Sequence, residues 1–325
     1  MQRAHAGRSD RSAALIASRT MSSPALPSRP AKRHSSRVLI ALAFLAIYVI
    51  WGSTYLAIRY AIETIPPLLT AGFRHLIAGS ILLAWGLVHG KRPTLVQWRA
   101  SLVLGFLFFL VGHGSLHWAE QSVPSGIAAL LIATEPIFLA VLIALTQTKR
   151  IPDKSTVAGL VLGLVGVAVL IKPDPAHLHG SLIGTLVVLV GALSWSAGIV
   201  VSRRSRLAGD PLMMTTLSLL SGAAMLLLVS WLTGEGRGFH PADVSLRSLY
   251  GLLYLIVFGS LVAFTAYNWL LERCSPTLVI THSYVNPIVA LLLGWALAGE
   301  RIDLSVLLAA VLVVSAIVLV RHAEG

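Results

Sequence analysis

A glutamate in the middle of an apolar segment is the most unusual feature of this sequence. Glu135 lies midway along the apolar run 124–146, directly before Pro136. A charge at the centre of a bilayer costs about 2.5–3.5 kcal/mol on insertion scales, so such residues usually have a function. We expect Glu135 either to bind a proton or a cationic group in a cavity, or to organise the kink at Pro136, where a backbone carbonyl loses its partner. The two roles are compatible.

A second buried charge is predicted at Arg74, about a turn and a half inside the apolar run 68–88 and next to His75. Its guanidinium could attract the carboxylate of a substrate, or it could pair with Glu135. Alternatively, the long side chain could extend, or snorkel, to the outer headgroups. We favour snorkelling or a structural pair.

Two tryptophans, Trp51 and Trp195, each lie about a third of the way into an apolar run. Tryptophan in membrane proteins usually belongs to the aromatic belt at an interface. Small hydroxyl side chains, which lipid would not favour, flank both residues: Ser53, Thr54, Ser194 and Ser196. The belt and a cavity-lining role therefore both remain open.

Histidine, tyrosine and asparagine make up the other polar side chains within apolar runs. They are His113, His117, His282, Tyr267, Asn268, Tyr284 and Asn286. Histidines titrate near neutral pH and could pass protons, whereas interhelical hydrogen bonding is the commoner role. The predicted substrate-cavity residues are Trp51, Ser53, Thr54, Arg74, His117, Glu135, Trp195, Tyr267, Asn268, Tyr284 and Asn286.

Several kinds of chemistry are not indicated. The single cysteine, Cys274, cannot form an intramolecular disulfide, and no Cys or His spacing resembles a metal site. The sequence contains no His-Glu-x-x-His, Gly-x-Ser-x-Gly or phosphate-binding Gly-rich loop. We therefore expect no catalytic residue, no metal and no cofactor.

The elements that must position these residues are membrane-spanning helices. Of the 325 residues, 56% are hydrophobic and 12% are charged, and the mean hydropathy is +0.82, whereas soluble domains carry about 25% charged residues. A helix crosses the hydrocarbon with about 20 apolar residues. This length predicts ten spans, near 38–58, 68–88, 98–118, 124–146, 155–172, 181–201, 212–232, 249–271, 276–298 and 303–321.

The basic residues predict the orientation of these spans. If residues 1–37 form a disordered basic cytoplasmic tail, the Lys and Arg from Arg29 onward divide into 15 on the cytoplasmic side and 5 on the other. Because Lys and Arg accumulate in cytoplasmic loops, both termini are expected in the cytoplasm. The net charge of +12 is explained in this way, without a nucleic-acid partner.

An internal repeat relates the two parts of the chain. A shift of 144 residues places Trp51 on Trp195, and a shift of 151 residues places Trp118 on Trp269 and Pro136 on Pro287. We call residues 38–172 the first half and 181–321 the second half. Because each half has five predicted spans, an odd number, the second half must enter the membrane from the opposite side. The predicted fold is thus an all-α integral membrane protein with a 5+5 inverted-topology repeat, which in transporters places the substrate at the interface of the repeats.

Several motifs also resemble a known family. The motifs are Trp51-Gly52-Ser53-Thr54-Tyr55, Trp118-Ala119-Glu120-Gln121, Thr134-Glu135-Pro136, Asn286-Pro287 and Gly299-Glu300-Arg301. They are similar to motifs of the drug/metabolite transporter superfamily, in particular its EamA-domain exporters. The resemblance covers residues 38–321 and implies two five-helix EamA repeats that export metabolites or drugs, with protons as a possible coupling ion. The first half departs from the pattern, because Lys149-Arg150 lacks the Gly-Glu of Gly299-Glu300-Arg301.

The sequence therefore predicts a secondary transporter for small metabolites, amino-acid-like, or for drugs. Its expected partners are the lipid bilayer, a small-molecule substrate and protons, and its expected location is a cell membrane, the inner membrane in bacteria. The alternative is a membrane-embedded enzyme or a receptor, although no catalytic motif and no soluble output domain is recognisable. The substrate and the oligomeric state are not encoded in any motif.

Overall fold

The computed structural model describes residues 33–148, 154–170, 178–204, 210–274, 279 and 281–322. The chain divides into two compact units, Met1–Val38 and Leu39–Gly325, and the following account concerns the second. Throughout the described residues the secondary structure is helical, without a strand. Most of the predicted tail lies outside these residues.

In the first half, several helices run directly into one another. Short turns at residues 62–66, 89–94 and 120–124 separate the described helical runs, and π-helical segments continue two of the runs. The elements are α1 (Arg33–Ala61), α2 (Pro67–Val88), α3 (Leu95–Leu104), η1 (Gly105–His113), α4 (Gly114–Ala119), α5 (Ser125–Ile132), α6 (Glu135–Ile143), η2 (Ala144–Thr148) and α7 (Lys154–Leu170).

The second half repeats this arrangement, including a π-helical segment within its third span. Its elements are α8 (Leu178–Arg204), α9 (Pro211–Thr233), the short 3-10 helix η3 (Pro241–Asp243), α10 (Leu246–Tyr254), η4 (Leu255–Val262), α11 (Ala263–Leu271), α13 (His282–Ala298) and α14 (Leu304–His322). The two π-helical segments, η1 and η4, occupy equivalent places in the repeat.

Seven helical stretches within the described residues are long and apolar enough to cross a membrane. They are Arg37–Ala61, Pro67–Val88, Leu95–Ala119, Ser125–Thr146, Leu182–Ser202, Pro211–Thr233 and Leu246–Leu271. Three shorter apolar helices follow the predicted spans 155–172, 276–298 and 303–321: Val157–Val169, Val285–Ala298 and Leu304–Ala316. Seven of the ten predicted spans therefore meet the length criterion. Of the three shorter helices, Val157–Val169 and Val285–Ala298 belong to predicted spans that include residues outside the described ranges.

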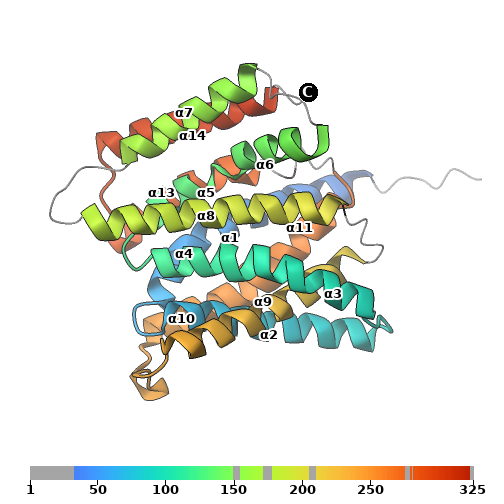
Figure 1. Ribbon diagram of the computed structural model, residues 1–325. Helices are drawn as coiled ribbons and strands as arrows, with labels where there is room; N and C mark the ends of the chain where they lie inside the picture. The colour runs from blue at the N-terminus through green and yellow to red at the C-terminus, as the bar shows by residue number, and fades with distance from the viewer. Residues whose placement is uncertain are drawn as a thin grey trace, which may run out of the picture. The chain divides into compact units, whose positions relative to one another are not determined.

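Corresponding helices of the two halves pack in pairs (Figure 1). α2 lies along α9, and α7 lies along α14. Small residues permit the second contact, since a Cβ at Gly166 of α7 would lie 3.0 Å from Cγ2 of Val313 and 3.2 Å from Cβ of Leu312. The first helix of each half instead contacts the opposite half. α8 packs on η1, α4, α5 and α6, and α1 packs on η4 and α13, where Gly52 meets Val289.

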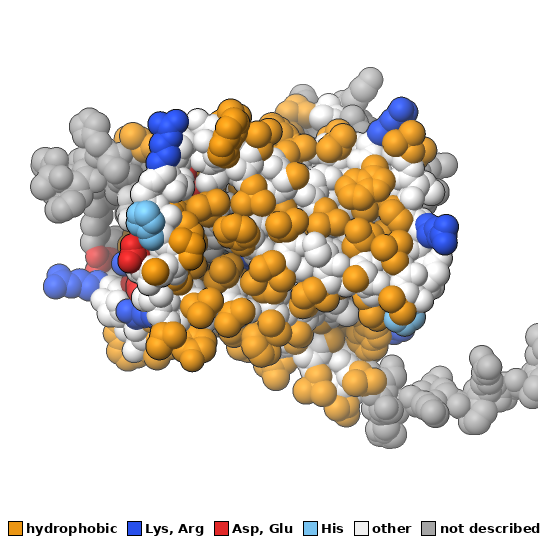
Figure 2. Space-filling view, turned by 90° about the horizontal axis from the view of Figure 1, so that it is seen from below, with side chains coloured by type: hydrophobic (Ala, Val, Ile, Leu, Met, Phe, Trp, Pro, Cys, Tyr) orange, Lys and Arg blue, Asp and Glu red, His pale blue; other side chains and the backbone are white. Residues whose placement is uncertain are grey.

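The outer surface is apolar along the helices. The face over α2, α9 and α10 is covered mainly by hydrophobic side chains, and Lys and Arg gather toward its two ends (Figure 2). On α2, a row with a spacing of four residues is exposed: Phe73, Ile77, Ile81 and Trp85. A broad exposed apolar surface with charges at its ends is what a lipid bilayer would cover.

Candidate functional site

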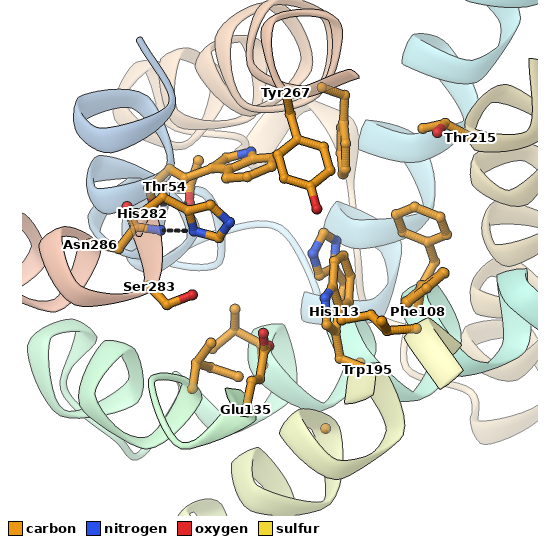
Figure 3. A pocket seen from close by; sticks show the side chains of 18 of the residues that line it. Thr54, Phe108, His113, Glu135, Trp195, Thr215, Tyr267, His282, Ser283 and Asn286 are labelled. Atoms are coloured by element: carbon orange, nitrogen blue, oxygen red, sulfur yellow. Dashed lines mark hydrogen bonds between the residues drawn. The ribbon is translucent and has the colours of Figure 1, made fainter. Parts of the chain in front are cut away.

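A cavity of about 700 Å³ lies inside the helix bundle. Both halves build its wall. The first half contributes residues from α1, α2, η1 and α6, and the second half contributes residues from α8, α9, α11 and α13. Figure 3 shows side chains from these helices directed into one common space. Ligand pockets commonly measure about 300–1,000 Å³, so this cavity is large enough for a small metabolite.

The wall of the cavity reaches one end of the bundle and stops short of the other. It extends to Ile143, Ser202, Pro211 and Leu271, which lie at the helix ends that the basic residues predict to be cytoplasmic. Pro211 and Leu271 are exposed. At the opposite end the wall stops at buried residues of α1 and α4, about a turn before these helices end. We call the two ends the open end and the closed end.

Both predicted tryptophans line this cavity, in matching environments. Trp51 donates from Nε1 to the backbone oxygen of Gly259 (3.2 Å) and packs edge-on against Phe264, with ring centres 5.5 Å apart. Trp195 packs against Phe108 at 4.7 Å and stacks on His113 at 5.1 Å. Gly259 and Phe264 follow Phe108 and His113 by 151 residues. Each tryptophan therefore contacts equivalent positions in the third span of the opposite half.

The hydroxyl residues beside Trp51 face in different directions. Thr54 lines the cavity and donates to the backbone oxygen of Trp51 (2.6 Å). Ser53, by contrast, lies outside the wall. Its hydroxyl bonds to the backbone oxygen of Ile50 (2.8 Å) and to the hydroxyl of Tyr254 (2.7 Å). Because neighbouring residues on a helix project about 100° apart, both could not face the same space.

Arg74 lies in the wall, with a residue exposure of only 3%. Its Nε donates to Oγ of Ser260 on η4 (2.9 Å). The snorkelling interpretation is therefore wrong, because a snorkelling guanidinium would reach water or headgroups. Among the described residues Arg74 forms no ion pair with Glu135, so that suggested pairing is also wrong. The cavity thus contains a buried guanidinium whose described hydrogen bond is to a neutral group.

Glu135 lines the cavity at the first position of α6. The helix breaks at Ala133 and Thr134, between α5 and α6, as the prediction of a kink requires. Ser196 of α8 donates to the backbone oxygen of Glu135 (2.9 Å). Within the described part of the chain, no hydrogen bond or ion pair involves the Glu135 carboxylate. This position combines the positive end of a helix with an acidic side chain, and it leaves the carboxylate available to a ligand.

The histidines divide between the wall and the layer behind it. His113 lines the cavity, and its Nδ1 bonds to Nε2 of His75 (2.9 Å). His117, a predicted cavity residue, lies behind the wall with an exposure of 0%. Its Nδ1 bonds to the backbone oxygen of His113 (2.7 Å), so this nitrogen must carry the proton. The π-helical η1 shifts the following residues away from the 3.6-residue period on which such predictions rest.

A second histidine, His282, lines the cavity beside Asn286 (Figure 3). When the oxygen and nitrogen of its side-chain amide are exchanged, Asn286 donates to the backbone oxygens of Tyr48 (3.3 Å) and His282 (3.0 Å). Tyr267 and Asn268 of α11 also belong to the wall.

The structure therefore brings together most of the predicted cavity residues. Those in the wall are Trp51, Thr54, Arg74, Glu135, Trp195, Tyr267, Asn268 and Asn286. Ser53 and His117 lie outside it, and the side chain of Tyr284 is not among the described residues. His113 and His282 also line the cavity, whereas their sequence positions predicted only polar residues within the membrane. No single motif separates His113 from His117, one helical turn later.

These features define a class of protein: a multi-pass helical membrane protein with a central cavity, mostly apolar but lined by several polar side chains, between two related halves. The model of the EamA-like transporter family matches residues 38–172 and 182–321, and the chain belongs to this family. The two matches correspond to the two halves of the repeat.

Proteins named as transporters are among its relatives. An uncharacterized inner membrane transporter of Escherichia coli, YedA, is 38% identical over 280 residues, which are 86% of this chain and 89% of the relative. Protein PecM of Dickeya dadantii is 31% identical and covers 84% of this chain and 89% of its own length. A protein of Escherichia coli named "probable amino-acid metabolite efflux pump" is 24% identical, covering 83% of this chain and 91% of the relative.

A solved crystal structure has the same fold. It aligns with a TM-score of 0.60 at 22% identity and covers 88% of this chain and 99% of the other. At this identity the likeness concerns the fold alone. The family match and the relative named as an inner membrane transporter support a multi-pass protein of the inner membrane.

Proposed function

We propose that this protein is a secondary transporter that exports small amino-acid-like metabolites by alternating access between two inverted halves. The observation that carries the proposal is a cavity whose wall is shared by both halves and reaches only one end of the bundle. Such a cavity can load a solute from one side and, after the halves rock, release it to the other. In the proposed orientation, the open end faces the cytoplasm.

The proposed topology has ten spans. Seven long and three shorter apolar helices together give this number, and the matching environments of Trp51 and Trp195 support a repeat. An even number of spans agrees with two cytoplasmic termini, as the basic residues predict. Reporter fusions after about residues 92, 150 and 322 should report the cytoplasm, and fusions near residues 120 and 240 should report the opposite side. An exchange of these two groups would rule out the proposed orientation.

The cavity wall favours a solute that carries both charges and an apolar part. Arg74 supplies a guanidinium that can hold a carboxylate in two parallel hydrogen bonds, and Glu135 supplies a carboxylate for an ammonium group. The two do not pair with each other among the described residues, so each can serve a ligand. The same wall contains aromatic rings, including Trp51, Trp195 and Phe264. The name of the 24%-identical efflux pump supports the same class of substrate.

A transport assay tests this proposal. Inside-out vesicles containing the protein would be offered labelled amino acids, sugars and cationic drugs. We expect uptake of amino acids with apolar side chains. Arg74→Gln should lower the uptake of carboxylate-bearing solutes by about tenfold or more, because a charged hydrogen bond contributes about 1.5–3 kcal/mol. Uptake of a cationic drug without a carboxylate should be affected much less.

Glu135→Gln should give the reverse pattern, with a larger loss for solutes that carry an ammonium group. Arg99→Gln and Glu63→Gln, at exposed positions, serve as matched controls, and transport is normalised to inserted protein. If Glu135 only organises the kink at Pro136, Gln will substitute well, as Asn286 does at the equivalent position. Equal losses for all solutes in both variants would contradict direct recognition, and uptake of none of the solutes would contradict the proposed function.

A further inference from the structure

A buried carboxyl group at the closed end is not used by the proposed substrate site. Glu120 follows directly after α4 and has an exposure of 1%. Within the described residues, neither of its carboxyl oxygens makes a hydrogen bond of normal geometry, although the backbone of Arg59 lies close enough to favour the charged form. A buried polar group is normally satisfied, and a buried charge is normally paired. An unpartnered, fully buried carboxyl group is therefore an exception that requires an explanation.

The closed end around Glu120 is held together by a second carboxylate from the other half of the chain. Glu300, between α13 and α14, accepts hydrogen bonds from the backbone nitrogens of Ser125 (2.9 Å) and Gly126 (3.1 Å). It also accepts a bond from Oγ of Ser125 (2.8 Å). These groups form the first turn of α5 in the first half. Glu300 thus connects the two halves where the cavity stops.

Arg59 is the basic residue of this cluster, and Glu300 engages it. Its Nε lies 3.7 Å from Oε1 of Glu300. The ionisable groups that face Glu120 are Arg59 and Tyr55 of α1, Arg74 of α2 and Glu300. His117 lies three residues earlier on α4. Glu300 repels a charge on Glu120. Of the two guanidinium groups that attract such a charge, Arg59 is engaged by Glu300 and Arg74 donates to Ser260.

In this closed arrangement Glu120 is stable as the neutral acid, because a charged carboxylate without a partner is strongly disfavoured away from water. If the closed end parted, Glu300 would leave α5, and water would reach Glu120. A hydrated carboxyl group beside Arg59 loses its proton at neutral pH. The protonation state of Glu120 and the closure of this end are therefore thermodynamically linked.

We propose that Glu120 is a proton-binding site that takes up one proton when the closed end forms and returns it when that end opens. In the balanced step, the carboxylate and a hydronium ion from water at the opening end give the carboxylic acid and one water molecule. No other bond changes. The proposal rests on the alternating access proposed above, and it identifies the proton as the ion whose binding favours the state that is open at the other end.

Cysteine accessibility tests this site without any substrate. In a Cys274→Ser background, Leu116→Cys places a thiol in the cavity wall near the closed end. Ala242→Cys places one in the exposed 3-10 helix η3, which follows α9 and defines the side at which the closed end opens. A membrane-impermeant maleimide is added on that side between pH 5.5 and 8.5. The labelling rate at position 116 is divided by the rate at position 242, which removes the pH dependence of thiol reactivity.

With Glu120 present, we expect this ratio to rise with pH, by up to about tenfold per pH unit for a single linked proton. Glu120→Gln, which is permanently neutral, should give a low ratio that does not change with pH. Glu120→Asp keeps a titratable group and should retain the rise. Glu63→Gln is the matched control, because it removes an exposed carboxylate near the end of α1, and the rise should persist.

The same rise in Glu120→Gln, or a ratio that is independent of pH in the parent protein, would overturn the proposal. These outcomes are separate from those of the transport assay. A flat ratio in a protein that transports amino acids would reject the proton site alone. Absence of transport together with a ratio that depends on Glu120 would reject the proposed substrate and leave the proton site supported.

Discussion

The second helices of the two halves begin alike but are capped differently. α2 starts with Pro67 after Pro66, and α9 starts with Pro211 after Asp210. The side chain of Asp210 accepts a hydrogen bond from the backbone nitrogen of Leu212 (3.0 Å), so α9 has a local cap. Pro66 makes no side-chain cap. The first amides of α2 are instead bound by a residue that is remote in sequence.

That remote residue is Glu235, which follows α9. Its carboxylate accepts from the backbone nitrogens of Leu68 (2.9 Å) and Leu69 (3.3 Å) and from the hydroxyl of Ser230 (2.6 Å). α5 is capped in the same way by Glu300. At the closed end, two helices of the first half therefore depend on carboxylates of the second half. A local cap stabilises one helix, whereas a remote cap also joins the two halves.

The largest expected effect comes from removing the buried remote cap. Glu300→Ala leaves two backbone amides at the start of α5 without an acceptor, and Pro124 provides no substitute. We expect a loss of about 2–4 kcal/mol in unfolding free energy, because buried donors without partners and lost charged hydrogen bonds are costly. Thermal unfolding in detergent micelles, followed by tryptophan fluorescence, measures this change.

The control for this variant is Glu272→Ala at the other end of the bundle. Its carboxylate pairs with the neighbouring Arg273 at 2.9 Å, and both side chains are largely exposed. Exposed pairs contribute about 0–1 kcal/mol, so little change is expected. Equal losses in the two variants would contradict the special role of remote caps.

A smaller effect is expected for Glu235→Gln. The amide oxygen can still accept one of the bonds at the start of α2, but the charge and one acceptor are lost. We expect a loss of about 1–2 kcal/mol, with faster hydrogen exchange at Leu68 and Leu69. Exchange at the start of α9 should not change, because Asp210 caps it independently. Parallel changes at both helices would show that the caps are not separable.

The smallest effect is expected at the local cap. Asp210→Asn preserves an effective N-cap and removes an ion pair with Lys91, whose side chain is 43% exposed. The expected change in unfolding free energy is less than about 1 kcal/mol at neutral pH. A loss as large as that of Glu300→Ala would break the distinction between local and remote caps.

The pH dependence of this local cap has a definite direction. Partial burial raises the pKa of Asp210, but hydrogen bonds from Lys91 and from the backbone amides of Leu212 and Met213 outweigh it and bring the pKa below its usual 3.8. The carboxylate therefore stabilises the folded protein above about pH 4. This stabilisation is lost as the pH falls through the lowered pKa. Stability measured between pH 3 and 7 should show this step in the parent protein and not in Asp210→Asn.

Several features of this protein could be read from the sequence alone. Apolar runs of about 20 residues gave the positions of the helices, because that length is fixed by the bilayer. Repeated Trp and Pro residues indicated two related halves, and the mid-span position of Glu135 marked it as exceptional. Each of these signals is local or periodic along the chain. The predicted orientation and the ten-span count also derive from such signals and await the fusion experiments.

Only the tertiary structure decided which polar groups meet. Periodicity along one helix could not show that Arg74 is buried against Ser260, that Ser53 faces Tyr254 rather than the cavity, or that His117 lies behind the wall. It also could not show that Glu300 caps α5, since the partners are about 175 residues apart in the chain. Such contacts depend on how helices pack sideways, and in a membrane that packing is set by shape and hydrogen bonding rather than by a hydrophobic pattern.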